Sequence, residues 1–110
     1  MPKTYDIQAL LTELELDQET IMEILKEFRS FLIEAMPKLE LAMSSGNLPE
    51  TRSLSHTIKG SAGNMRVKAV YQTAYKMQTA ADASDWATLK TLFEQLKIEA
   101  QEFLAETSSL

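Results

Sequence analysis

The chain of 110 residues contains no cysteine and a single histidine, His56. Without cysteine it can hold neither a disulfide scaffold nor a thiolate metal site, and one histidine excludes any site that needs two imidazoles. No hydrophobic run approaches the roughly 20 residues of a membrane span, and the N-terminus lacks the layout of a signal peptide. We therefore expect a cytoplasmic protein that does not insert into membranes.

Residues that break or disfavour helices are also scarce. Glycine and proline together number six, and two valines stand against 15 leucines, 12 alanines and 12 glutamates. The length of the chain is typical of one domain, so we expect a single domain over residues 1–110. The composition predicts an all-α fold, and short breaks between long helices favour an antiparallel up-and-down four-helix bundle with a short accessory N-terminal helix.

Apolar residues recur at helical spacing in five segments. The first, from Tyr5 to Leu14, is too short to be stable alone, so we expect it to pack across an end of the bundle. Pro37 predicts a kink or a local break near residues 34–36 of the second segment. The four longer segments are predicted at about 17–45, 47–64, 67–81 and 85–104.

Charge is unevenly distributed along the chain. The formal net charge is −5, so nucleic acid is not an expected partner. Residues 51–81, however, contain no acid and five bases, which gives this segment +5 and the other 79 residues −10. One interpretation is chance clustering on a solvated face. The other is a positive field for an anionic group or an acidic partner, and the presence of His56 in this segment favours it.

His56 is predicted to face water. The apolar residues of its helix, Leu54, Ile58, Ala62 and Met65, keep to one stripe, and His56 is turned ~200° away from its neighbours in that stripe. The residues that share its face are Lys59, Gly60 and Gly63, with Arg52 one turn before.

The two glycines of this face are unfavourable for a helix, because each destabilises a helix interior by about 1 kcal/mol relative to alanine. They are explained if another protein approaches closely at Gly60 or Gly63. The alternative is a helix end, or a crossing with a neighbouring helix. On the next segment, Tyr71 and Tyr75 lie one turn apart and are predicted to serve packing.

An exposed imidazole beside a lysine in an acid-free segment suits a nucleophile that carries a phosphoryl group. Neutral imidazole offers a lone pair on one ring nitrogen, and Lys59 can neutralise charge on the transferred group. Little else is required, because phosphoryl transfer depends mainly on positioning and electrostatics.

The segment around His56 resembles a known family. The run His56-Thr57-Ile58-Lys59-Gly60-Ser61-Ala62-Gly63-Asn64 is similar to the active-site helix of histidine phosphotransfer (HPt) domains, whose core motif is His-x-x-Lys-Gly followed by small residues. The resemblance extends over most of the chain, through Phe31-Leu32, Pro37 and a Ser-Gly-Asn turn before the motif and an amphipathic pair of helices after it.

The resemblance implies roles for individual residues. His56 would be phosphorylated on the ring nitrogen remote from the main chain, Lys59 would stabilise phosphate charge, and Gly60 would permit partner approach. The family often has a glutamine on the following helix, and Gln78 corresponds to it; this side chain would orient the ring or bond the phosphate. The alternative interpretation is that Gln78 is a polar residue at the boundary of the core without such a role. The expected partner-binding residues are Arg52, Gly60, Gly63, Arg66 and Lys68.

One position departs from the family pattern. The family commonly has glycine ten residues after the histidine, where this chain has Arg66. If the helix continued that far, Arg66 would lie toward the edge of the active face. There it would contact the phosphate or the partner, or hinder the partner's approach.

The implied partners are receiver domains of response regulators and a hybrid sensor histidine kinase. A receiver presents a phosphorylatable aspartate and binds Mg²⁺ in an acidic pocket, so the chain itself would need no cofactor. We expect no kinase activity of its own, because the sequence has no P-loop and no kinase glycine loop. We also expect a monomer. The start at Met1 and the polar end at residues 107–110 favour a free-standing relay protein.

Three alternatives remain. The chain could be a helical docking module whose His56 is never phosphorylated, or the phosphoacceptor domain of a chemotaxis-type histidine kinase. A helical metal or catalytic bundle is disfavoured, because such sites need several inward Glu and His residues and the inward stripes here are apolar.

Overall fold

The computed structural model describes residues 4–110, which form five α-helices and no strand. The prediction of an all-α fold is confirmed, and the helix bounds lie within about two residues of those predicted. The helices are α1 (Ile7–Leu14), α2 (Gln18–Ser44), α3 (Leu48–Asn64), α4 (Lys68–Asp82) and α5 (Trp86–Glu106).

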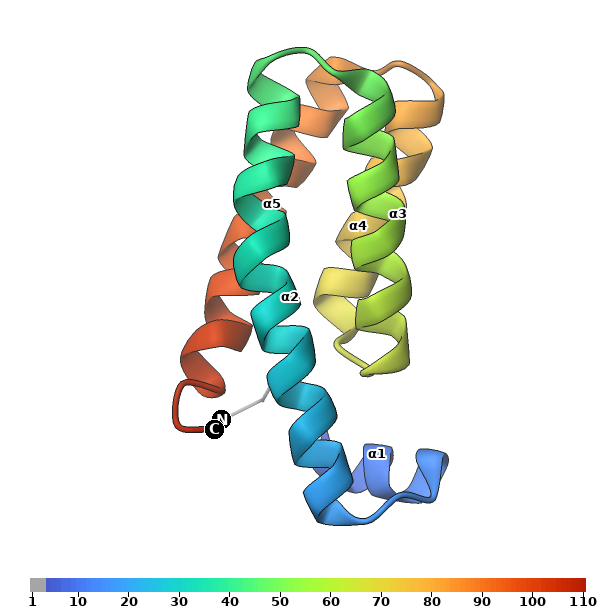
Figure 1. Cartoon of the computed structure of the whole chain (residues 1–110). Coiled ribbons are helices and arrows are strands. Elements are labelled where there is room, and N and C mark those ends of the chain that lie inside the picture. Colours follow the sequence, from blue (N-terminus) through green and yellow to red (C-terminus); the bar gives the residue numbers. More distant parts are fainter. Residues whose placement is uncertain (1–3) are drawn as a thin grey trace.

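The four long helices lie side by side in an elongated body of 42 × 24 × 24 Å (Figure 1). The chain reverses direction at each of the three connections between α2 and α5. The helices that follow each other along the chain contact one another, and α2 also meets α5. The short α1 contacts α2 and lies crosswise at the lower end of the body in this view.

Large apolar side chains from every helix fill the interior. The Phe103 ring of α5 packs edge-on against Phe28 of α2, with ring centroids 5.2 Å apart, and against Tyr5, at 5.9 Å. Burying a side chain of this kind stabilises the fold by about 1.5–3 kcal/mol, so these contacts help to hold the N-terminal segment against α2 and α5. The fully buried large side chains are Leu10, Ile21, Leu25, Leu32, Leu39, Ile58, Val67, Val70, Met77, Leu89, Leu96 and Phe103.

Helix α2 continues through Pro37, and the local break predicted at residues 34–36 is absent. Proline cannot donate a backbone hydrogen bond to the carbonyl four residues earlier, which is that of Ile33. Pro37 is exposed and Ile33 is 47% exposed, so water can reach this part of the helix. The buried residues on both sides, Leu32 and Leu39, keep the helix against the core.

Three helices end in the same way, with one residue in the left-handed region. Gly46, Arg66 and Ser84 have φ values of 69°, 58° and 55° and follow the C-caps of α2, α3 and α4. After α3, the Arg66 N–H donates to the Gly63 carbonyl and the Val67 N–H donates to the Ala62 carbonyl, which is the Schellman arrangement. These ends turn the chain sharply and set each helix beside the one before it.

Within residues 4–110, no helix combines the length and the apolar character that crossing a bilayer would require.

Candidate functional site

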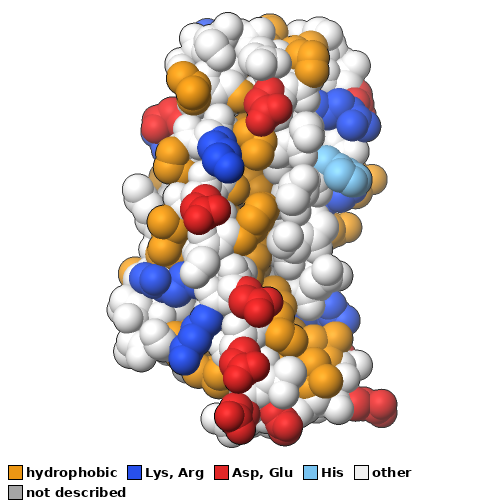
Figure 2. Space-filling model, viewed as in Figure 1, with side chains coloured by type: hydrophobic (Ala, Val, Ile, Leu, Met, Phe, Trp, Pro, Cys, Tyr) orange, Lys and Arg blue, Asp and Glu red, His pale blue; other side chains and the backbone are white. Residues whose placement is uncertain are grey.

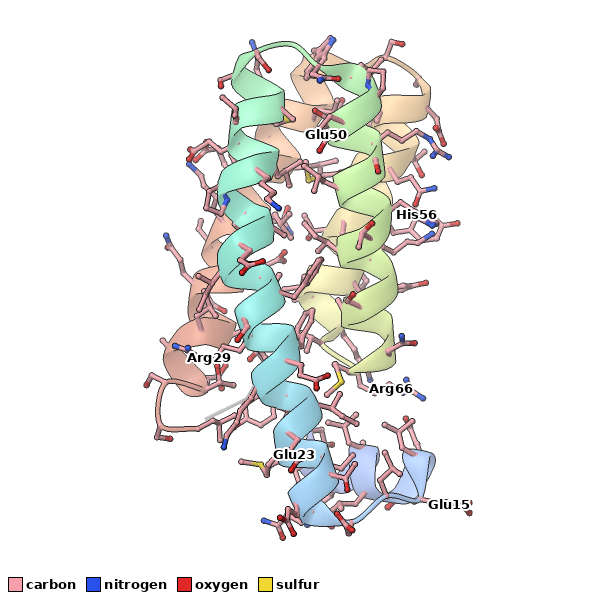
Figure 3. The ribbon with its side chains drawn as sticks, viewed as in Figure 1. Glu15, Glu23, Arg29, Glu50, His56 and Arg66 are labelled. Atoms are coloured by element: carbon pink, nitrogen blue, oxygen red, sulfur yellow. The ribbon has the colours of Figure 1, made fainter. Side chains whose placement is uncertain are left out.

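His56 lies in the middle of α3 and is exposed, as the helical periodicity predicts. Its neighbours Ser55 and Ile58 are fully buried, because they point toward the other helices of the bundle. Figure 3 shows the His56 side chain projecting away from the body, on the side where α4 runs behind α3.

The exposed face of α3 meets α4 through a regular series of residue pairs, which we call the α3–α4 seam. Steps of four, three and four residues along α3 are matched by equal steps back along α4. This matching follows from the antiparallel packing of two helices with the same rise per residue. The contacts of the seam are Arg52–Asp82, His56–Gln78, Lys59–Tyr75 and Gly63–Tyr71.

The contact between His56 and Gln78 orients the imidazole. Nδ1 of His56 lies 3.2 Å from Oε1 of Gln78, within hydrogen-bonding distance. An amide oxygen accepts and does not donate, so Nδ1 carries the proton in this arrangement. The lone pair of the neutral ring is then on Nε2, the nitrogen remote from the main chain.

The next contact holds the Lys59 side chain. Its Nζ lies over the Tyr75 ring, 5.1 Å from the centroid, and Tyr75 is itself 52% exposed. Tyr71 packs edge-on against Tyr75 with centroids 6.1 Å apart. The two tyrosines do pack against each other, as predicted, but they do so at the surface of α4 and not in the core.

Gly60 and Gly63, the two glycines on the face of α3 that carries His56, have different surroundings. A Cβ built at Gly60 meets no atom within 4 Å, so nothing inside the described chain requires glycine there. A Cβ at Gly63 would lie 3.2 Å and 3.3 Å from two carbons of the Tyr71 ring. Gly63 therefore fits the alternative of a crossing with a neighbouring helix, whereas the surface above Gly60 is open.

Two of the five bases of residues 51–81 are paired with acids from outside that segment. Arg52 forms a salt bridge with Asp82, and Arg66 forms one with Glu13 of α1. The three lysines of the segment form no salt bridge with any residue of the described chain. The uncompensated positive charge of residues 51–81 therefore comes from Lys59, Lys68 and Lys76, and Lys59 is the one on the same helical face as His56.

Arg66 does not extend the active face, because α3 ends at Asn64. At about 1.5 Å per residue, ten residues place it some 15 Å from His56 along the helix axis, and Figure 3 shows it at the lower end of α3. Its guanidinium donates to the carbonyls of Gly63 and Asn64 and to Glu13. Its positive φ also explains the glycine that the family pattern has at this position, since glycine adopts this conformation without strain.

Apolar side chains form a stripe along the face between α2 and α3, and a band of other side chains separates this stripe from the histidine (Figure 2). Part of the stripe is a shallow groove of about 280 Å³, which reaches α3 just beyond Gly60. The groove is lined by Ile24, Glu27, Phe28, Phe31, Ser61, Asn64 and Met65.

The family resemblance predicted that Gln78 lies near His56, and the structure brings the two side chains together, but the contact between Lys59 and Tyr75 was not predicted. The signal was available: once Gln78 is paired with His56, a step of three residues along each antiparallel helix leads to Lys59 and Tyr75.

The fold and the site define an all-α bundle that presents one oriented imidazole to solvent. The Hpt domain family matches residues 23–106, and the chain belongs to this family. Members of the family are helical bundles that take part in histidine phosphotransfer within two-component phosphorelays, and they interact with receiver domains of response regulators. The match leaves out α1 and the beginning of α2. No curated protein and no solved structure matches the chain significantly.

Proposed function

We propose that this domain is a phosphotransfer intermediate. His56 accepts a phosphoryl group from the aspartate of one receiver domain and passes it to the aspartate of another. The observation that carries the proposal is the 3.2 Å contact between Nδ1 of His56 and Oε1 of Gln78. It fixes an exposed ring with its lone pair on Nε2, which is the form that a nucleophile needs.

In the transfer step, the Nε2 lone pair attacks the phosphorus of the aspartyl phosphate. The bond from phosphorus to the carboxylate oxygen breaks, and the aspartate leaves as a carboxylate. The imidazole ring keeps its Nδ1 proton, so it becomes cationic, and Oε1 of Gln78 accepts the hydrogen bond from this more polar N–H. The reverse sequence delivers the phosphoryl group to the second receiver.

Lys59 supplies positive charge one turn from His56, where it lowers the free energy of the developing phosphoryl charge. The divalent ion belongs to the acidic pocket of the receiver. The domain is therefore a substrate and relay without a kinase site of its own, and a hybrid sensor histidine kinase lies upstream.

The receiver approaches over Gly60, where the surface is open. It also contacts the apolar stripe between α2 and α3. Exposed Lys68, at the start of α4, adds positive charge at the edge of this surface. Arg52 and Arg66 contribute less to this attraction, because Asp82 and Glu13 compensate their charges. Gly63 supports the surface indirectly by making room for Tyr71.

The architecture that serves this function is an antiparallel up-and-down bundle of α2 to α5, with α1 as an accessory helix. Residues 1–110 act as one domain and as a monomer, because a single His56 on an open face is sufficient for each encounter with a receiver.

The test is incubation with a labelled, phosphorylated receiver and Mg²⁺. The expected product is a phosphoprotein that is labile in acid and stable in alkali, as phosphohistidine is. His56→Gln should keep its helical circular dichroism and remain unlabelled. Label on the Gln variant would overturn the assignment. Binding of the receiver without any transfer would favour a docking module instead.

A further inference from the structure

The Tyr75 ring contributes little to the core, since 52% of the residue is exposed on α4. Its face nevertheless has a specific neighbour, the Lys59 ammonium, 5.1 Å from the ring centroid. A cation at this distance is attracted by the negative face of the ring. The same helix supplies Gln78 to His56 one turn further on, so α4 contacts both chemically important residues of α3.

The position of the Tyr75 ring is itself constrained. Tyr71 packs against it in an edge-to-face arrangement with an interplanar angle of 66°, and the Tyr71 ring also lies close to Gly63 of α3. A Cβ at Gly63 would press on the Tyr71 ring at 3.2 Å, so the absence of a side chain there is what lets Tyr71 sit in this place.

Lysine has a flexible four-carbon stem that samples many rotamers unless a partner restrains it, and Lys59 is half-buried. Within the described chain Lys59 has no carboxylate partner, so no salt bridge fixes it. A carboxylate would also cancel the charge that the phosphoryl group requires. An aromatic face restrains the ammonium and leaves its charge uncompensated.

We propose that Tyr75 is a positioning residue for phosphotransfer: it holds the Lys59 ammonium beside His56 before the phosphoryl group arrives. This inference rests on the proposed function of His56. It predicts that the ring, and not the hydroxyl, of Tyr75 is required, and that the requirement exists only while Lys59 is present.

The test uses phosphoramidate as the phosphoryl donor, because this small molecule needs no docking surface. Its P–N bond breaks as Nε2 of His56 attacks, and ammonia leaves. Tyr75→Leu should label about two- to fivefold more slowly, the factor that corresponds to the ~0.5–1 kcal/mol of an exposed cation–π contact. Tyr75→Phe, which keeps the ring, should label at the wild-type rate.

The Lys59→Ala background gives the decisive control. There Tyr75→Leu should cause no further loss, whereas a purely structural effect of the leucine would persist. An unchanged or faster rate for Tyr75→Leu in the wild-type background would overturn the inference, as would an equal loss in both backgrounds. If the wild type itself takes no label from either phosphoramidate or a receiver, the proposed function fails and the inference fails with it.

A measurement on the unmodified protein makes the inference testable even if a variant does not fold. In the NMR spectrum, the ε-methylene protons of Lys59 should be shifted upfield by the ring current of Tyr75. Lys68 and Lys76, the other two lysines of residues 51–81, have no ring contact within the described chain and serve as references. A Lys59 signal that coincides with theirs would contradict the contact.

Discussion

Oε1 of Gln78 lies 3.2 Å from Nδ1 of His56, although 22 residues separate the two positions in the chain. The contact exists because α3 and α4 pack against each other in an antiparallel register that the buried faces of both helices enforce. The most reactive atom of the proposed site, Nε2 of His56, is therefore directed by a residue of the neighbouring helix.

Removal of the Gln78 amide should slow phosphoryl transfer. Gln78→Leu keeps most of the side-chain volume but offers no acceptor for the Nδ1 proton. We expect a two- to tenfold slower labelling of His56, in keeping with the ~0.5–1.5 kcal/mol of a typical hydrogen bond. Gln72→Leu, on the exposed side of the same helix, is the matched control. If both variants label at the wild-type rate, Gln78 is only a boundary residue.

The two glycines of the active face should respond differently to alanine. Gly60→Ala adds a methyl group in open space and should raise the free energy of unfolding by about 0.5–1 kcal/mol. Gly63→Ala gains the same helix propensity but displaces the Tyr71 ring, so its net gain should be smaller or negative. Urea denaturation measures the free energies of unfolding of the two variants. Equal values would show that the contact with Tyr71 does not affect stability.

Bulk at Gly60 should interfere with the partner and not with the chemistry. Gly60→Leu is expected to take phosphate from phosphoramidate at the wild-type rate and from a phosphorylated receiver more slowly, because only the receiver must approach the helix. Comparison of the two donors on the same protein provides the measurement. Equal transfer from the receiver would exclude Gly60 from the docking surface.

Arg66 should be replaced more readily by glycine than by alanine. The residue has a φ of 58°, a conformation that costs an L-residue roughly 1 kcal/mol and glycine very little. Both substitutions remove the salt bridge to Glu13, so the difference between them isolates the backbone term. We expect Arg66→Gly to be about 1 kcal/mol more stable than Arg66→Ala in thermal or urea unfolding. Equal stabilities of the Arg66→Ala and Arg66→Gly variants would mean that the end of α3 rearranges.

The N-caps of α2 and α5 should make stability depend on pH in the acidic range. The Thr20 backbone N–H lowers the pKa of Asp17, and the Thr88 hydroxyl, followed by its backbone N–H, lowers the pKa of Asp85. A folded-state pKa below the unfolded value of about 3.9 stabilises the native state above that pH, and this contribution is lost as the pH falls through the folded pKa.

Asp85→Ala should therefore have a lower melting temperature than the wild type at pH 7. The difference between the two melting temperatures should narrow as the pH falls below about 4. Thermal melts monitored by circular dichroism across this range give the comparison. A constant gap at all pH values would show that ionisation of the cap does not matter.

Much of the site was predictable because helical periodicity is a local property. Leu54, Ile58 and Ala62 identify the buried side of α3, and this alone turns His56 outward. The helix bounds follow equally from caps such as Asp17 and Asn47, whose side chains accept from the first turn of their helices. The contacts of Arg66 were harder to predict, since they depend on the left-handed conformation of this one residue directly after the end of α3.

The sequence by itself determined which segments are helices and which face of α3 is exposed, because both follow from residue spacing within one helix. It also determined that an acid-free segment surrounds the one histidine, because this is a matter of composition alone. The tertiary structure decided which residue of α4 meets which residue of α3. It paired His56 with Gln78, placed Lys59 over Tyr75 and distinguished Gly60 from Gly63. Those pairings depend on the register between two helices, which arises from the packing of their buried faces and from the sharp turn at Arg66.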